Sequence, residues 1–250
     1  MKNIDRLILK AAMMGMAIYG IAQSNALAAT LSNGHTDIGL AEMDTLALHW
    51  HDEETNTEYE PDEAHAYVPP VLSATTRPAG AEWDFLGVAA NNTYYQLPES
   101  EDPDLLFLGI GAEDATPGAF DAWNPGDLRG ANTSDNWFQL ALVGLTYTGS
   151  GAGVFSAWSD DGLGSPILWM SSSDGLDGTD CVYVTDHGHY NFAFSDEGLY
   201  ELEFEVRAYQ SGSLITSAPA TFLFVVPEPT SAVLMLSGVA LLATRRKRLA

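Results

Sequence analysis

The chain has 250 residues, a single cysteine and a formal net charge of −24 at pH 7. Residues 29 to 226 hold 32 acidic side chains against three arginines, which gives this region a net charge near −29. Because such a surface repels phosphates and attracts cations, the composition excludes a nucleic-acid partner. The lone Cys181 forms no internal disulfide, so burial of a hydrophobic core must stabilise the fold.

The first 28 residues have the three parts of a secretory signal peptide. A basic start with Lys2, Arg6 and Lys10 precedes the apolar stretch AAMMGMAIYGIA, and the segment ends on a small-x-small pattern at Ala28. This order predicts export, with cleavage by signal peptidase after Ala28. The alternative, a buried N-terminal helix, does not explain the small residues at the end.

Short runs of β-branched and aromatic residues, separated by Gly, Pro, Asn and Asp, follow the signal peptide. This rhythm is typical of an all-β domain. The predicted strands lie near 43–51, 66–72, 105–111, 138–149, 153–158, 181–184, 200–208 and 220–226. We expect one domain over residues 29–226. It is a single antiparallel β-sandwich, immunoglobulin-like or jelly-roll-like, flanked by an N-terminal signal helix and a C-terminal anchor helix.

The strand YELEFEVRA (200–208) alternates strictly between apolar and charged residues. Alternate residues of a strand face opposite sides of a sheet, so one face of this strand is expected to be buried and the other exposed. A Gly-x-Tyr sequence, Gly198 to Tyr200, enters the strand. It resembles the corner tyrosine of immunoglobulin-like sandwiches.

Four of the six histidines form two His-x-His pairs, His49 with His51 and His187 with His189. In LALHWH the apolar residues alternate with the histidines, and in HGHYNFAF the aromatic residues do so. Both pairs are therefore predicted to point away from the core. Two solvated pairs that bind nothing are one interpretation.

A metal site is the other interpretation. Histidines two apart on a strand project from one face about 6.5 to 7 Å apart. If the two strands were neighbours, one ion would take a histidine from each pair, and imidazole favours zinc, copper or nickel among divalent transition metals. His35, just before the first strand of the domain, is a further candidate ligand. Asp37 and Asp186 are candidates for a carboxylate ligand or a second-shell partner.

Motifs for catalysis are missing from the sequence. There is no Gly-x-Ser-x-Gly and no glycine-rich phosphate loop between a strand and a helix, and the carboxylates are too numerous to single out a pair. We therefore expect a non-catalytic protein. An adhesin or matrix protein that stacks extracellular glycans on exposed aromatics is the alternative function, although most tryptophans are expected to pack in the core.

The C-terminal segment, residues 227–250, has three parts in order. Pro227, Glu228 and Pro229 precede an apolar stretch at about 231–243, which at thirteen residues is short for a spanning helix. The basic residues that end it are Arg245, Arg246, Lys247 and Arg248. By the positive-inside rule the basic end stays in the cytoplasm.

The segment resembles the PEP-CTERM sorting signal. The resemblance implies that an exosortase cuts near the motif and passes the protein to the cell envelope, the cell surface or an exopolysaccharide matrix.

Several stretches together also resemble one domain family over residues 34–226. They are NGHTDIGL, LALHWHDEETNTEYEPDEAHAYV, WDFLGVAANNTYYQLPESEDPDLLFLGIG, HGHYNFAFSDEGLYELEFEVRAY and TFLFVV. The chain resembles the choice-of-anchor M domain of bacterial surface-anchored proteins. The last stretch also resembles the surface-anchored repeat of actinobacterial wall proteins, with Phe192 in place of a tryptophan. The family has no established enzymatic role to carry over to this chain. Its actinobacterial relatives occur alongside transporters that resemble zinc and manganese importers, and this association raises the hypothesis of metal binding.

Overall fold

The computed structural model describes residues 28–40, 46–112, 120–122, 138–184 and 187–228. In these ranges strands dominate, so the expected all-β class is confirmed. Outside the described residues lie residues 1–27 of the signal segment, the C-terminal apolar stretch, Asp186, Pro229 and the basic residues Arg245 to Arg248. No helix in the described part of the chain is long and apolar enough to cross a bilayer.

The largest sheet has seven strands, in the order β1-β5-β17-β15-β9-β12, with β16 paired to β15. The strands are β1 (Ala29–Leu31), β5 (Ala64–Tyr67), β9 (Phe138–Gly149), β12 (Cys181–Val184), β15 (Gly198–Gln210), β16 (Ser213–Thr216) and β17 (Ala220–Val226). In β15 the predicted alternation is confirmed, because Tyr200, Leu202 and Phe204 are buried whereas Glu201 and Glu203 are exposed.

Two five-stranded sheets complete the domain, in the orders β11-β10-β14-β7-β6 and β13-β8-β2-β3-β4. The first contains β6 (Ala74–Thr76), β7 (Thr93–Leu97), β10 (Phe155–Asp160), β11 (Pro166–Ser171) and β14 (Asn191–Phe194). The second, called the histidine sheet below, contains β2 (Gly34–Leu40), β3 (Leu48–Asp52), β4 (Thr57–Tyr59), β8 (Leu106–Gly111) and β13 (His187–His189).

The sheets are not purely antiparallel, which corrects the prediction. Strand β5 pairs in parallel with both β1 and β17, and β2 pairs in parallel with β8. Alternation in the sequence specifies which face of a strand is buried, but it carries no information about the direction of the neighbouring strand. The direction therefore had to come from the tertiary structure.

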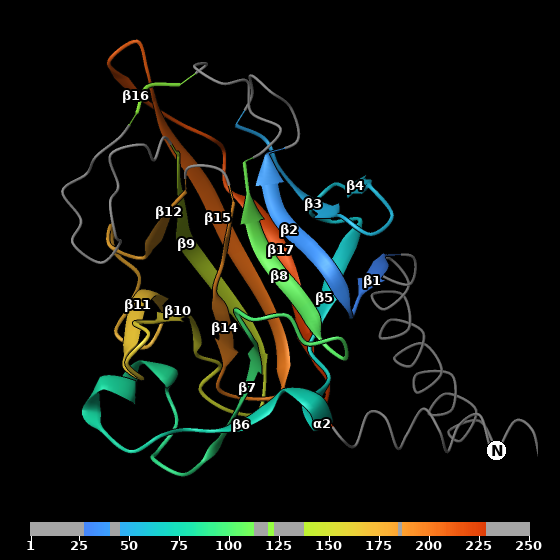
Figure 1. Ribbon diagram of the computed structural model, residues 1–250, viewed down its shortest axis with the longest axis vertical. Helices are drawn as coiled ribbons and strands as arrows, with labels where there is room; N and C mark the ends of the chain where they lie inside the picture. Colours follow the sequence, from blue (N-terminus) through green and yellow to red (C-terminus); the bar gives the residue numbers. More distant parts are fainter. Residues whose placement is uncertain (1–27, 41–45, 113–119, 123–137, 185–186, 229–250) are drawn as a thin grey trace, which may run out of the picture.

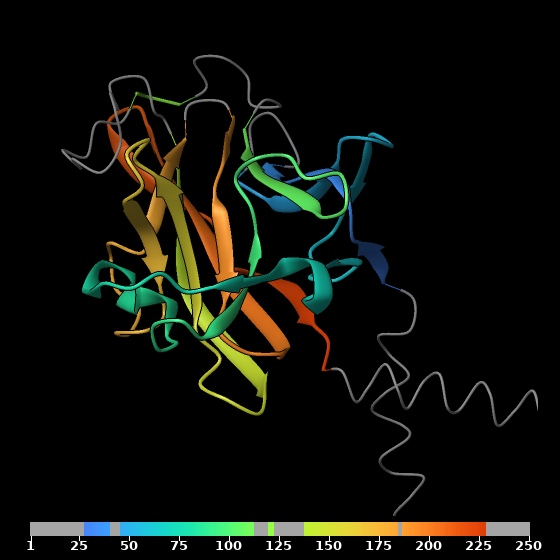
Figure 2. The ribbon, with the colours of Figure 1, turned by 60° about the horizontal axis from the view of Figure 1, so that its bottom comes forward.

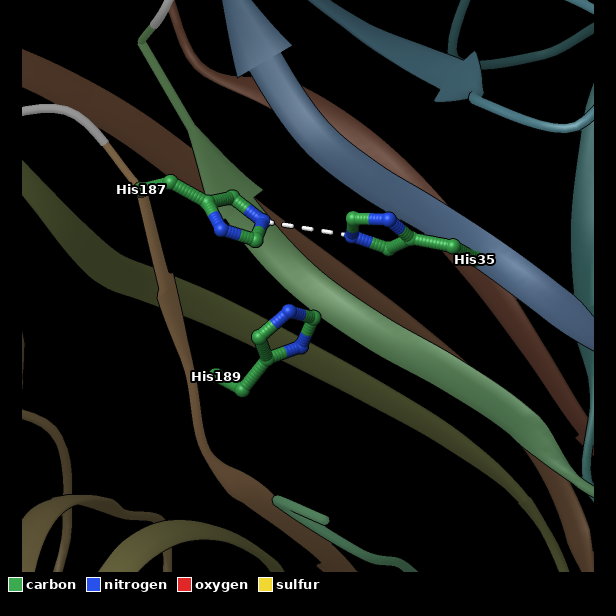
Figure 3. Close-up of side chains that lie close together, drawn as sticks. All are labelled: His35, His187 and His189. Carbon is green, nitrogen blue, oxygen red and sulfur yellow. Dashed lines mark hydrogen bonds between the residues drawn. The ribbon is translucent and has the colours of Figure 1, made fainter. Parts of the chain in front are cut away.

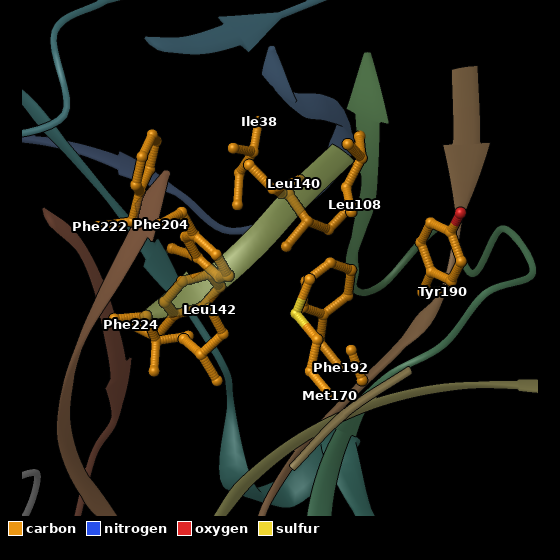
Figure 4. Packing of buried hydrophobic residues seen from close by; sticks show 14 of the residues in the cluster. Ile38, Leu108, Leu140, Leu142, Met170, Tyr190, Phe192, Phe204, Phe222 and Phe224 are labelled. Carbon is orange, nitrogen blue, oxygen red and sulfur yellow. The ribbon is translucent and has the colours of Figure 1, made fainter. Parts of the chain in front are cut away.

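Both five-stranded sheets pack on the seven-stranded sheet, so the domain is a two-layer sandwich with one layer divided (Figure 1). Trp50 of β3 packs against Phe222 of β17, with ring centroids 4.8 Å apart. Phe194 of β14 packs against Phe224, which also lies on β17, with ring centroids 5.4 Å apart. Figure 4 shows this shared core, in which Ile38 and Leu108 of the histidine sheet lie near Leu140 of β9.

The region predicted as a strand near 66–72 is instead divided between β5 and a short helix, α2 (Pro70–Ser73). Proline fixes φ in the range of a helix and donates no backbone hydrogen bond, so Pro70 ends the strand and suits the first position of a helix. The chain then continues through the 3-10 helix η1 (Ala81–Leu86). Figure 2 shows this teal segment running across one end of the sheets.

The stretch HGHYNFAF does not form one strand. Strand β13 joins the histidine sheet and β14 joins the other five-stranded sheet, with Tyr190 between them. The predicted faces are nevertheless kept, because Phe192 and Phe194 are fully buried in the core and the histidines of β13 are not. Because the strand is interrupted at Tyr190, His187 and His189 lie on the histidine sheet, together with β2 and β3.

Tyr200 has the contacts expected of a corner tyrosine. Its hydroxyl donates to the backbone oxygen of Asp196 at 2.8 Å and accepts from the backbone nitrogen of Asp196 at 3.0 Å. These bonds tie the turn before β15 to the start of that strand. The lone Cys181 is buried as a small apolar residue, as predicted.

Candidate metal centre

The register of the histidine sheet aligns its chemistry-bearing residues on one face. Gly109 of β8 lies opposite Asp37 of β2 on one side and opposite His189 of β13 on the other. Residues directly across from each other share a face, as do residues two apart on a strand. His35 and His187 therefore lie on the same face as Asp37 and His189. The opposite face, with Ile38 and Leu108, packs in the core.

Three imidazoles converge there, from His35 on β2 and from His187 and His189 on β13 (Figure 3). Each offers one ring nitrogen, and these three atoms lie within 4.8 Å of one another. The Nε2 atoms of His35 and His187 are 3.2 Å apart. The ring centroids of His187 and His189 are separated by 4.4 Å, and the two rings are almost perpendicular at 88°. This cluster can hold a metal ion.

Asp37 lies beside the three imidazoles and is only 1% exposed. Its Oδ1 is 3.0 Å from Nε2 of His187 and 3.2 Å from Nε2 of His35. Its Oδ2 is buried and has no hydrogen-bond partner among the residues that the structure describes. Leaving a buried polar atom unpaired costs free energy, so a carboxylate in this state indicates a missing partner.

Gly109 provides the space for this arrangement. A Cβ placed on Gly109 would overlap with Oδ1 of Asp37 and would lie 2.7 Å from Nε2 of His187 and 3.0 Å from Cε1 of His189. No side chain larger than hydrogen fits there without moving the cluster. An isolated glycine in an apolar strand is a signal of such a close approach, and the sequence LLFLGIG contained it. Gly109 is therefore the residue in the sequence that could have indicated the position of this site.

The orientation of His189 is held by two contacts. Its Nδ1 donates to the carbonyl oxygen of Leu108 at 3.1 Å, because a carbonyl can only accept. Its ring stacks on Phe107, with centroids 3.6 Å apart and an angle of 10°. The hydrogen on Nδ1 leaves the lone pair on Nε2, the usual arrangement of a metal-binding histidine. Burial lowers the pKa of His189, which favours the neutral ring that a metal requires.

The other pair does not join this cluster. His49 and His51 lie on β3, which is separated from β13 by β2 and β8. Three strand spacings amount to about 14 Å, too far for one ion to take a histidine from each pair. The sequence-based hypothesis of such a shared site is therefore wrong. His35, which was expected to precede the first strand, instead lies within β2 and completes the cluster.

The surroundings of His49 and His51 also differ from the interpretation in which both pairs are solvated. Both are on the face predicted, but His49 is only 2% exposed. Its Nδ1 donates to the carbonyl oxygen of Gly39 at 3.1 Å, and its Nε2 is 3.9 Å from Oε1 of Glu58. Nδ1 of His51 is 2.9 Å from Oε1 of Glu53. The two rings are 5.9 Å apart and tilted by only 30°.

Exposed tryptophans, which the glycan hypothesis needs, are not found among the residues described. Trp50, Trp83, Trp158 and Trp169 are all at most 7% exposed. Trp83 and Trp158 form a perpendicular pair in a smaller apolar cluster with η1. Core packing is therefore the role of the four tryptophans that the structure describes, as predicted for most of them.

Comparisons of the chain with protein-family models, with curated proteins and with solved structures found no match.

Proposed function

We propose that this domain binds a divalent transition metal, with zinc as the first candidate, through His35, His187 and His189. The observation that carries the proposal is the convergence of three ligand nitrogens within 4.8 Å. Imidazole nitrogen is a preferred ligand of zinc, copper and nickel, whereas calcium and magnesium prefer oxygen. The Nδ1 bond of His189 to a backbone carbonyl supports the same conclusion, because it directs Nε2 toward the ion.

Access and charge support binding from solution. The side chains of His35 and His187 are 32% and 25% exposed, so an ion can reach their nitrogens without opening the core. The domain also carries a large excess of negative charge, which raises the local concentration of cations. A metal-binding role is therefore consistent with both the site and the surface around it.

We further propose that the protein is exported and non-catalytic and acts at the cell envelope or in the extracellular matrix. The support is the sequence, in which a signal peptide and a PEP-CTERM-like tail enclose a region similar to the choice-of-anchor M domain. Pro227 and Glu228 directly follow β17, so the predicted sorting motif begins where the described fold ends.

Elemental analysis of the purified chain, expressed without a histidine tag, tests the metal proposal. We expect about one equivalent of zinc after dialysis against zinc, and a higher melting temperature than in chelator. Less than about 0.1 equivalent, with no thermal shift from zinc, copper or nickel, would overturn the proposal.

Sorting is tested separately by deleting residues 227–250 and following the protein in fractionated cells. We expect the truncated protein to lose surface delivery. An unchanged location would refute sorting by this segment, without bearing on the metal site.

A further inference from the structure

Asp37 carries an inference that deepens the proposed metal site and rests on it. We propose that Asp37 is a direct ligand, so that the ion is held by three imidazole nitrogens and one carboxylate oxygen in a closed tetrahedral site. The sequence alone left Asp37 as either a ligand or a second-shell partner. The geometry of the cluster distinguishes the two roles.

The ring nitrogens that Asp37 approaches indicate whether it binds the metal directly. A second-shell carboxylate accepts a hydrogen bond from the ring nitrogen that does not bind the metal. Oδ1 of Asp37 instead approaches Nε2 of His187 and Nε2 of His35, and these two nitrogens also face each other at 3.2 Å. The carboxylate thus lies on the side of the rings where the ion would sit.

The second argument is distance. Zinc binds nitrogen and oxygen ligands at about 2.0 to 2.2 Å, which places two ligands of a tetrahedral site roughly 3.3 to 3.6 Å apart. The three atoms Oδ1 of Asp37, Nε2 of His35 and Nε2 of His187 form a triangle with sides of 3.0, 3.2 and 3.2 Å. This triangle is slightly smaller than one face of such a tetrahedron. His189 supplies the fourth corner.

The third argument is the state of the carboxylate itself. Asp37 is 1% exposed, its Oδ2 lacks a hydrogen-bond partner within the described ranges, and no lysine or arginine is paired with it in the described part of the chain. A buried carboxylate is costly unless it is paired or coordinates a metal. The glycine at position 109 keeps open the space that the carboxylate occupies. A bound cation would supply the missing charge.

A closed site has a functional consequence. Catalytic zinc keeps an open position for water or substrate, whereas a zinc ion with four protein ligands does not. Direct ligation by Asp37 therefore makes the ion itself the ligand that this domain holds, and it gives no position at which water would be activated. It also favours a tetrahedral ion over magnesium, calcium and manganese, which prefer octahedral or larger oxygen shells.

Cobalt substitution tests this inference on the unmodified full-length chain. Co²⁺ in a four-coordinate site absorbs visibly, and an exogenous anion shifts that spectrum only if it can reach an open position on the ion. We expect azide in large excess to leave the visible bands of the cobalt protein unchanged. A shift on adding azide would overturn the closed site. Absence of any cobalt or zinc binding would instead overturn the proposed function.

The variant Asp37→Asn provides the second measurement. We expect zinc affinity to fall by about 100-fold or more, because loss of a ligand should cost at least as much as loss of a second-shell partner. We also expect azide to shift the cobalt spectrum of this variant, since the fourth position is now open. If Asp37→Asn bound zinc more weakly but azide still left its cobalt spectrum unchanged, Asp37 would act as a hydrogen-bond partner of a ligand and not as a ligand.

Glu58→Gln is the matched control. Like Asp37, Glu58 is a carboxylate next to a histidine of the histidine sheet. Glu58 differs in that it lies on β4, is exposed and is near His49. We expect unchanged zinc affinity and no azide effect. An equal loss of affinity in Glu58→Gln and Asp37→Asn would show that the summed charge of the surface, rather than ligation by Asp37, attracts the ion.

Discussion

The two His-x-His pairs lie on the same face of one sheet, yet only one of them converges. The rings of His187 and His189 are 4.4 Å apart and nearly perpendicular, whereas those of His49 and His51 are 5.9 Å apart and closer to parallel. Within the described residues, His187 and His189 belong to a group of ligand nitrogens that lie within 4.8 Å of one another, and His49 and His51 do not. The motif alone therefore does not make a metal site.

The neighbouring strands account for the difference. Beside β13, the missing side chain of Gly109 leaves space that Asp37 of β2 occupies, and His35 of β2 lies 3.2 Å from that carboxylate. Beside β3, the carbonyl oxygen of Gly39 takes the Nδ1 hydrogen of His49. A pair becomes a site only when the strands next to it supply both space and further ligands.

His187→Ala should have the largest effect. It removes one of the converging nitrogens, so we expect zinc affinity, measured by titration calorimetry, to fall by about 100-fold or more. His49→Ala is the matched change in the other pair and should leave zinc affinity and stoichiometry unchanged. Equal losses in the two variants would contradict the assignment of the site to the convergent pair.

Gly109→Ala should weaken zinc binding by about 10-fold or more, because the added methyl overlaps with Asp37 and crowds His187. We also expect a loss of about 1 to 3 kcal/mol in the free energy of unfolding, measured with urea in chelator. Gly39→Ala is the control, since its Cβ would meet Gly111 O at 3.2 Å and His49 Cε1 at 3.5 Å. If Gly39→Ala weakened zinc binding more than Gly109→Ala, the role of the gap at position 109 would be refuted.

His49→Ala should destabilise the domain by about 1 to 3 kcal/mol without affecting the metal. The buried ring and its hydrogen bond to Gly39 are lost, and the carbonyl is left without that donor. His51→Ala should cost less, because its ring is 16% exposed and bonds mainly to Glu53 and Asn56. Urea unfolding in chelator measures both variants. A larger loss for His51→Ala would be evidence against a structural role for His49.

Acidification should give the smallest effect. Burial lowers the pKa of His189 from its usual 6.5, so the unfolded chain takes up this proton at a higher pH than the folded chain. The stability that neutral His189 contributes is thus complete above about pH 6.5 and is lost as the pH falls toward the lowered pKa. In chelator, we expect the urea midpoint to fall between pH 7.5 and 5.5 by more in the wild type than in His189→Asn. Identical falls would contradict this expectation.

The pattern of residues in the sequence predicted much of the fold. The run 138–149 became β9, 181–184 became β12 and 220–226 became β17, each within the predicted bounds. These segments have apolar residues at the spacing of a strand, and burial of that face decides their structure locally. The prediction failed at 66–72, where two consecutive prolines exclude a continuous strand.

Three properties could be predicted from the sequence: the all-β class of the domain, its strongly acidic character and the direction in which the side chains of β13 and β3 point. These properties depend on composition and on a period of two residues, both of which are local. The strand order could not be predicted in this way: β13 pairs with β8, β8 pairs with β2, and Gly109 therefore lies between Asp37 and His189. These pairings join residues about 70 to 80 positions apart in the sequence. For that reason the sequence named the right residue types for a metal site, and the fold selected which three histidines meet.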